Sequence, residues 1–519
     1  MTWLRAAACA ALTLFVSASW ALAQDTTLTS RDGKVEVSGF LLGFDGEFYR
    51  IRTQFGELTV DASGVSCDGP GCPSLTDHVA EIRLSGSSTM AEVLLPALIE
   101  AFAQQRGMHV RREALTGTRT VFSLHQPRRA LPLARFTIHA SDTDQGFADL
   151  LSHDADVVMA MREIRTPERS DAFDAGMGDL AEANRSRVLA LDAIVPVVAQ
   201  ENPIQGISAA DLARVFAGEI ANWSELQGPD APIALHLPAA GAGLSQAVED
   251  RLLEPAGKSL AATVTRHARS SQVARAVAAD PFAIGLASFA ETGVARALAL
   301  TGPCGFALSA SRWTIKTEDY PLTSPMFLYL PARRLPKIAR DFLAFTRSAE
   351  AQSVIRGAGF VDQSPETIRL GVQGDRLANA IAAAGEEVDL TEMQRLVNTL
   401  APMARLTTSF RFETGSSRPD AQSRSNILQL AEALETGVYD ARKLYFVGFS
   451  DGEGQADGNA RIAQRRAEAV RDAVLAAVET ALPESVEIGV EAFGEALPMA
   501  CDDSDWGRQV NRRVEVWVR

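Results

Sequence analysis

The segment that most constrains the fold lies near the C-terminus, at residues 443–467, and reads KLYFVGFSDGEGQADGNARIAQRRA. Its residues 444–449 are apolar and favour a β-strand, and the glycines that follow are typical of a loop. Asn459 can cap a helix that begins after this loop. The segment therefore predicts a strand, a glycine-rich loop and a helix, in that order.

Two opposite charges stand out in this predicted unit. Apolar residues recur at helical spacing after Asn459, yet Arg466 lies on the same face, four residues after Ile462 and four before Val470. A cation on that face needs a partner, and the loop could bring Asp451 back to it. The two side chains would then offer one negative and one positive group to a zwitterion such as an amino acid, whose carboxylate an arginine binds through two hydrogen bonds.

Four ordered motifs in residues 406–519 resemble the OmpA-like peptidoglycan-binding domain. They are FRFETGSSRP near the start, GFSD with RRA in the segment above, FGEALP, and NRRVEVWV at residues 511–518. The resemblance implies an α+β fold and peptidoglycan as partner, with Asp451, Asn459 and Arg466 in the site. In that family the loop Asp and the helix Arg hold the free amino-acid centre of diaminopimelate in the stem peptide. The usual GHTD is GFSD here, so Phe449 and Ser450 replace His and Thr while both charges remain.

An alternative interpretation of these charges stays open. Asp451 and Arg466 could form a structural ion pair in a domain that has lost its ligand.

The N-terminus predicts export. Residues 1–23 carry Arg5, an apolar run, and an Ala-Leu-Ala cleavage sequence before Gln24, as secretory signal peptides do. No later stretch reaches the roughly 18 consecutive apolar residues that a membrane-spanning helix needs. We therefore expect a protein of the Gram-negative periplasm that is associated with the cell wall or the outer membrane.

The charge balance narrows the class of partner. The chain has 50 basic and 65 acidic residues and a net charge of −15. Such a balance argues against nucleic acid or an anionic membrane surface as a partner. It does not argue against a small anion, because a binding site needs only local donors.

The cysteines predict disulfides. Removal of Cys9 with the signal peptide leaves an even number of cysteines, which in an exported chain favours disulfides. Cys67 and Cys72 enclose an Asp-Gly-Pro-Gly turn and are predicted to pair, whereas a zinc site there would lack a nearby histidine. Cys304 and Cys501 remain, and whether they pair and so tie two domains together stays open. No metal and no cofactor are predicted.

The first mature residues predict a small all-β module. Residues 24–78 contain short alternating segments separated by Asp-Gly, Phe-Gly-Glu and Ser-Gly turns, which is the pattern of hairpins. A folded spacer or a docking module is the function that this pattern suggests.

The central region predicts anion chemistry on an α/β fold. An apolar segment at Arg83 and Leu84 leads into SGSSTM and then into a helical pattern. A Ser/Thr/Gly loop between a strand and a helix directs hydroxyls, N–H groups and the positive helix end at one point, although a helix cap alone would look the same. Strand and helix patterns then alternate over about 270 residues, which favours α/β lobes with largely parallel sheets.

In order and spacing, residues 81–361 resemble the phosphate-type periplasmic substrate-binding proteins. The most specific segments are SGSSTM, FAGEIANWSEL and FLAFTRSAEAQSVIRGAGFV. The resemblance implies two lobes, chain crossings near Leu191 and near Leu300, and a ligand in the cleft. The residues that match the three anion-binding loops are Ser87, Ser88, Thr89, Arg162, Gly241, Gly243 and Ser245.

Two of these loops depart from the family pattern. Met161-Arg162 replaces Ser-Arg or Ser-Asp, and Arg162 could equally be an exposed charge after a strand. Residues 240–245, AGAGLS, replace a Ser-Gly-Thr-Arg sequence, and the loss of a charge-assisted arginine bond predicts weaker phosphate binding or another ligand. Backbone N–H groups of this loop could still hold an oxyanion.

The predicted fold is multidomain, with a small all-β module, a two-lobed α/β periplasmic-binding-protein fold and an α+β OmpA-like domain. The expected parts are residues 1–23, 24–78, 79–369, a helical linker at 370–405, and 406–519. The main functional hypothesis is an exported, non-enzymatic protein that captures phosphate or a related small anion while anchored to peptidoglycan. The alternative is an envelope scaffold without a ligand, which presents its lobes to a protein partner. An enzyme is disfavoured because no GxSxG sequence or nucleophile–base set is apparent.

Overall fold

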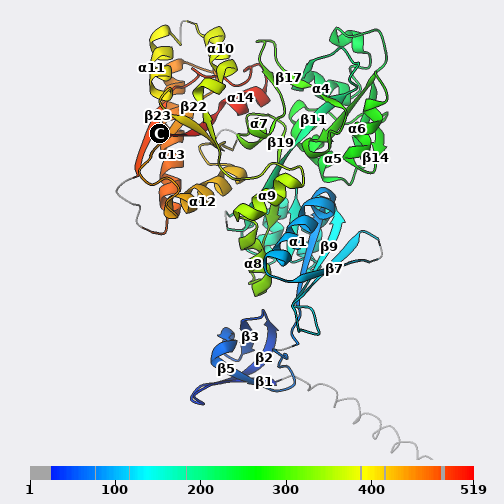
Figure 1. Cartoon of the computed structure of the whole chain (residues 1–519), viewed down its shortest axis with the longest axis vertical. Helices are drawn as coiled ribbons and strands as arrows, with labels where there is room; N and C mark the ends of the chain where they lie inside the picture. The colour runs from blue at the N-terminus through cyan, green and yellow to red at the C-terminus, as the bar shows by residue number, and fades with distance from the viewer. Residues whose placement is uncertain are drawn as a thin grey trace, which may run out of the picture.

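The computed structural model describes residues 25–519 except 76, 116, 183, 386–387, 414–415 and 481–485. The predicted signal peptide at residues 1–23 lies outside the described residues. Figure 1 shows a small sheet at one end, a two-lobed body, and a C-terminal domain beside the lobes. The predicted multidomain fold is confirmed. Within the described part of the chain, no helix is both long and apolar enough to cross a membrane.

The N-terminal module is an antiparallel five-stranded sheet in the order β4-β3-β2-β1-β5. Its strands are β1 (Asp25–Ser30), β2 (Glu36–Phe44), β3 (Phe48–Thr53), β4 (Gly56–Asp61) and β5 (Val65–Asp68). Among the described residues of this module, the fully buried apolar side chains are Leu28, Tyr49 and Ile51. The Cys67–Cys72 disulfide closes the turn after β5, as predicted. Such a small core needs support of this kind.

Lobe 1 comprises residues 80–190 and 324–361 and is built on a sheet in the order β19-β10-β6-β9-β8-β7. The central strands β10, β6 and β9 are parallel, and helices cover the sheet. The strands are β6 (Ala80–Ser87), β7 (His109–Ala114), β8 (Arg119–His125), β9 (Ala134–Ser141), β10 (Val157–Ala160) and β19 (Thr323–Tyr329). The helices are α1 (Leu95–Gln105), α2 (Thr143–Leu151), α3 (Thr166–Asp174), α8 (Lys337–Phe345) and α9 (Ala349–Gly357).

Lobe 2 comprises residues 191–323 and contains two sheets. The larger continues from β11 in the order β11-β15-β13-β14, and the smaller has the order β12-β17-β18. The strands are β11 (Ser186–Val198), β12 (Gly206–Ser208), β13 (Ala234–Pro238), β14 (Thr265–His267), β15 (Ala283–Ser288), β16 (Arg296–Ala297), β17 (Ala299–Thr301) and β18 (Ala307–Leu308). The helices are α4 (Ala209–Phe216), α5 (Gly243–Val248), α6 (Ser270–Ala278) and α7 (Arg312–Lys316).

Two long strands connect the lobes. β11 is 13 residues long and runs through both lobes, and β19 pairs with it antiparallel from Ser186↔Tyr329 to Ala193↔Thr323. The first crossing, near Leu191, is as expected. The second crossing was expected near Leu300 and is instead at β19, because Leu300 lies in β17 inside lobe 2. Sequence spacing alone did not reveal that residues 296–322 complete lobe 2 before the chain returns.

The C-terminal domain comprises residues 367–519 and has a sheet in the order β20-β21-β24-β22-β23. Its strands are β20 (Thr367–Arg369), β21 (Ala404–Phe410), β22 (Lys443–Phe449), β23 (Glu487–Ala492) and β24 (Arg513–Val518). Its helices are α10 (Gly374–Ala383), α11 (Leu390–Leu400), α12 (Ala421–Glu435), α13 (Ala456–Ala477) and α14 (Asp505–Asn511). Alternate residues of β22 enter different cores, with Leu444 and Phe446 against α12 and α13, and Val447 and Phe449 against α10 and α11. The helices at residues 370–405 therefore cover the second face of this sheet.

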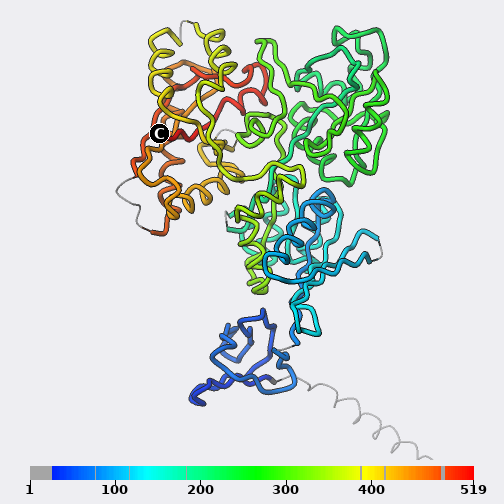
Figure 2. Tube along the Cα trace, in the orientation of Figure 1, coloured from blue at the N-terminus to red at the C-terminus, as the bar shows by residue number. Residues whose placement is uncertain are grey.

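The C-terminal domain lies beside the two lobes in the Cα trace of Figure 2, and it contacts both. On lobe 1, the Glu163 carboxylate accepts a hydrogen bond from the backbone N–H of Ala421 at 3.2 Å. On lobe 2, the Trp506 indole donates to the carbonyl of Arg251 at 2.8 Å. A disulfide joins Cys304 of lobe 2 to Cys501, so the pairing that the sequence left open is present. These contacts attach the domain to both lobes.

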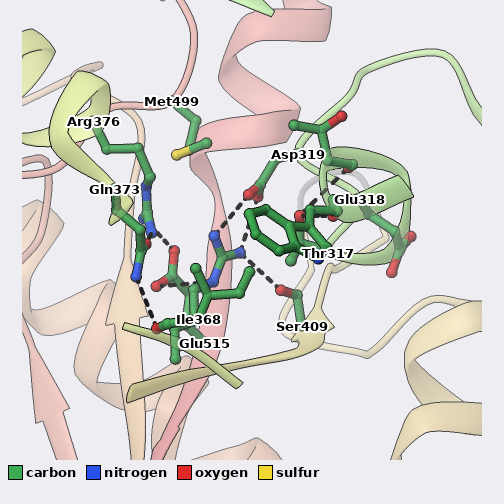
Figure 3. A network of polar contacts seen from close by, with 12 residues as sticks. Thr317, Glu318, Asp319, Ile368, Gln373, Arg376, Ser409, Met499 and Glu515 are labelled. Atoms are coloured by element: carbon green, nitrogen blue, oxygen red, sulfur yellow. Dashed lines mark hydrogen bonds and ion pairs between the residues drawn. The ribbon is translucent and has the colours of Figure 1, made fainter. Parts of the chain in front are cut away.

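A buried charge network lies at this interface. Asp319 of lobe 2 accepts hydrogen bonds from Arg405 at 2.7 Å and from Arg411 at 3.0 Å. Beside it, the Arg376 guanidinium lies 2.6 Å from Glu515. Figure 3 shows this pair close to Asp319. Burial alone would raise the pKa of Glu515, but the neighbouring cations Arg376 and Arg405 outweigh burial and lower that pKa to about 2. Both carboxylates are therefore ionised and paired.

Candidate functional site

The wall site is the name used here for Asp451, Arg466, Arg512 and Phe412 in the C-terminal domain. Asp451 follows β22, and Arg466 lies on α13, so the predicted strand–loop–helix unit places both at one end of the sheet. The Asp451 carboxylate lies 2.6 Å from the Arg512 guanidinium. Contrary to the expected ion pair, the partner in contact with Asp451 is thus Arg512, and Arg466 makes no ion pair with any described residue.

Arg466 is a buried cation in an unfavourable setting. Its side chain lies over the Phe412 ring, with the guanidinium carbon 5.1 Å from the ring centroid, and its Nε atom is buried without a hydrogen-bond partner among the described residues. Burial lowers the pKa of Arg466, Arg512 lowers it further, and Asp451 only partly opposes them. A ligand carboxylate next to Arg466 would supply the missing counter-charge and a hydrogen-bond acceptor for its guanidinium.

Asn459 supports the loop rather than capping the helix. α13 begins at Ala456 with Gln455 as its N-cap residue, so Asn459 lies inside the first turns, and its predicted capping role is wrong. Its side-chain amide donates to Glu495 at 2.6 Å. The backbone N–H of Gly452 also donates to Asp502 at 2.8 Å. These bonds hold the loop that carries Asp451.

Sequence reasoning did not assign a role to Arg512. A signal was present in NRRVEVWV, because Arg512 precedes β24 and Arg513 begins it, so strand alternation turns the two side chains in different directions. Arg513 is fully buried, whereas Arg512 reaches Asp451.

The cleft site is the name used here for the three loops at the lobe junction. Ser87 ends β6 and is fully buried, and Ser88 and Thr89 begin a helical segment that continues through a π-helical turn (Met90–Leu94) into α1. Gly243 begins α5, and a Cβ atom there would lie 2.9 Å from the Ser87 hydroxyl and 3.0 Å from Cγ of Met161. The structure therefore brings the three predicted loops together, and they pack closely against one another.

Arg162 is surrounded by carboxylates. It is buried rather than exposed, and its guanidinium pairs with Asp144, with Glu168 at 2.7 Å and with Asp250 at 3.7 Å. Burial opposes its charge, but the hydrogen bonds to Glu168 and Asp144 raise its pKa. The sequence could not reveal this environment, because Asp250 belongs to lobe 2. Arg162, which was expected to contact the anion, is therefore already paired with carboxylates of the protein.

The third loop obtains an arginine from a different strand. The Ser245 hydroxyl donates a hydrogen bond to the Pro238 carbonyl at 3.0 Å. The Arg266 guanidinium, on β14, donates to the Ser245 hydroxyl at 3.1 Å and to the Pro238 carbonyl at 2.9 Å. Arg266 is exposed and was not identified from the sequence. The Ser245 side chain thus points toward the lobe-2 backbone. Arg266 brings a positive charge to the loop at residues 240–245, which lacks the arginine of the family pattern. Near this loop, a Cβ at Gly241 would lie 3.7 Å from Asp142.

Direct contacts also close the cleft. The backbone N–H of Thr143 donates to Gln246 at 3.1 Å, and Arg165 of lobe 1 lies 2.8 Å from Asp250 of lobe 2. The lobes are therefore held together by their own side chains.

Comparisons with known proteins agree with this architecture. Residues 73–350 match the profile of the PBP superfamily domain, and residues 411–512 match that of the OmpA family. Protein SphX of Synechococcus elongatus is 25% identical over 237 residues, which cover 43% of this chain and 68% of that protein. Phosphate-binding protein PstS of Borreliella burgdorferi is 23% identical over 195 residues, which cover 35% of this chain and 67% of that protein.

A solved structure, an ABC-type phosphate transport receptor from Vibrio cholerae, aligns with 54% of this chain and 99% of that chain. The identity is 20% and the TM-score is 0.41.

Proposed function

Because the chain belongs to the PBP superfamily and ends in an OmpA-family domain, we propose that it is an exported, non-enzymatic binding protein anchored to peptidoglycan. The observation that carries the proposal is the setting of Arg466, a buried cation without an ion pair among the described residues. Such a group is poised to receive a carboxylate from a ligand.

The chemistry of the wall site fits the free amino-acid centre of diaminopimelate in a stem peptide. The Arg466 guanidinium would bind the carboxylate through two parallel hydrogen bonds. The Asp451 carboxylate would accept from the ammonium group while it keeps its contact with Arg512. The ring of Phe412 would exclude water from one side of Arg466 and so strengthen both interactions.

Anchoring would fix the orientation of the two lobes. The C-terminal domain is joined to lobe 2 by the Cys304–Cys501 disulfide and to lobe 1 through Glu163. A wall-bound C-terminal domain would therefore hold the lobes in place, unlike a binding protein that diffuses to a membrane permease.

For the cleft, we propose phosphate or a related small anion as ligand. The hydroxyl groups of residues 87–89 at a helix start and the charge of Arg266 support this role. The similarity to a protein named as phosphate-binding points the same way. The engagement of Arg162 by three carboxylates favours the alternative, an envelope scaffold without a ligand that presents its lobes to an envelope protein.

Calorimetric titration of inorganic phosphate into the mature protein distinguishes these two functions. We expect binding with a dissociation constant of about millimolar or tighter, and we expect Ser87→Ala to weaken it, because Ser87 would be a direct donor. Ser353→Ala, which removes an exposed hydroxyl of α9, serves as the matched control. The absence of heat at millimolar phosphate would remove phosphate as the ligand and leave the scaffold.

A further inference from the structure

A cavity of about 240 Å³ lies between lobe 1 and the C-terminal domain, away from the wall site and the cleft site. We call it the seam cavity. Residues of β11 and of the turn after α8 form one wall, and one face of α12 forms the other. Among the polar and charged residues that line it are Arg187, Arg347, Gln363, Ser425, Gln429 and Glu432.

Arg187 is the unusual member of this set. It lies on β11 and makes no ion pair or side-chain hydrogen bond with any other residue that the structure describes, and its Nε atom is buried without a partner. Burial and the like charge of Arg347 lower its pKa to about 10, while Glu432 acts in the opposite direction. Arg187 is partly buried, and a guanidinium that loses part of its hydration without gaining a partner is destabilising.

The charges around the seam cavity leave it net positive. Arg347 lies 3.7 Å from Glu432, and both side chains are about half exposed, at 45% and 56%, which places them at the mouth. Glu432 can therefore offset one of the two arginines but not both. The remaining positive charge, at Arg187, is less exposed than this pair, and Ser425 and Gln429 add polar groups along α12.

We propose that the seam cavity binds a small organic or inorganic anion whose carboxylate or phosphate group pairs with Arg187. The planar fork of a guanidinium fits either group through two parallel hydrogen bonds. Because the cavity is lined by both lobe 1 and α12, the bound anion would join the binding-protein body to the domain that carries the wall site. The proposal depends on neither the cleft ligand nor peptidoglycan.

The test uses the mature protein and its Arg187→Met variant, with citrate and inorganic phosphate as separate probes in a low-chloride buffer. Without anion, we expect Arg187→Met to melt at a higher temperature than the wild type, because the uncompensated charge is gone. We expect wild-type binding, followed by calorimetry and by the rise in melting temperature, to weaken at least about tenfold in the variant. A response to citrate identifies a carboxylate ligand, and a response to phosphate identifies a phosphate group.

Arg275→Met removes an exposed arginine on α6 and should leave both readouts at the wild-type values. The phosphate titration is repeated in Ser87→Ala, because phosphate can also enter the cleft. A phosphate response that Ser87→Ala abolishes and Arg187→Met retains belongs to the cleft and overturns the phosphate part of the proposal. No response of the wild type to either anion would overturn the whole. The proposal would also be overturned if Arg187→Met had a lower melting temperature than the wild type and bound anions with unchanged affinity. Arg187 would then contribute to packing and not to anion binding.

Discussion

Replacement of Arg466 by alanine is expected to release the mature protein from sedimented peptidoglycan. The guanidinium would make two charged hydrogen bonds to the ligand carboxylate, and each contributes roughly tenfold or more to affinity. Asp451→Ala should have a similar effect, because it removes the acceptor for the ligand ammonium group. The measurement is the fraction of protein that sediments with insoluble peptidoglycan, compared with the wild type.

The structure supplies a control for this experiment. Arg466 makes no ion pair with any described residue. Its removal therefore leaves no buried carboxylate without a partner and should not disrupt the fold. Arg461→Ala removes an exposed guanidinium from the same helix and should sediment as the wild type does. Retention of both Arg466→Ala and Asp451→Ala on peptidoglycan would contradict the roles proposed for these residues.

Asp319→Asn is expected to destabilise the protein by about 3–5 kcal/mol, the range for breaking a buried ion pair from one side. The substitution leaves Arg405 and Arg411 buried next to a neutral amide. Among the described residues, Glu515 is then the one carboxylate left in an ion pair with Arg405, at 3.3 Å. The measurement is the free energy of unfolding in denaturant with the Cys304–Cys501 disulfide intact.

The same prediction has a pH dependence. Burial would raise the pKa of Asp319, but Arg405 and Arg411 hold it below the ordinary value of 3.8. A lowered native pKa stabilises the protein above the unfolded pKa, and this advantage is lost as the pH falls below it. The difference between wild type and Asp319→Asn should therefore be full at pH 7 and shrink below about pH 4. Asp341→Asn breaks a partly exposed pair with Arg106 and should cost less than about 1 kcal/mol. An equally small effect of Asp319→Asn would contradict this account of the interface.

Local patterns in the sequence predicted the parts of this fold that depend on neighbours in the chain. The apolar run before Asp451 and the helical spacing around Arg466 gave the strand, loop and helix of the wall site correctly. The turn between Cys67 and Cys72 likewise predicted a disulfide from a short range of chain.

The parts that the sequence did not predict depend on residues brought together by the tertiary fold. Asp451 meets Arg512 rather than Arg466 because β24 runs beside β22 in the sheet, and only the strand order reveals this. Arg162 is neutralised partly by Asp250, which another lobe supplies. The amphipathic helices at residues 370–405 were expected, but their packing against the sheet of the C-terminal domain required the partner surface.

The most direct test of wall anchoring compares two peptidoglycans that differ at one position of the stem peptide, diaminopimelate or lysine. Lysine in the stem peptide lacks the second carboxylate, so it offers an ammonium to Asp451 but nothing to Arg466. We expect the mature protein to sediment with the diaminopimelate form and to remain in solution with the lysine form. Equal sedimentation with both forms would contradict recognition of an amino-acid centre by Asp451 and Arg466.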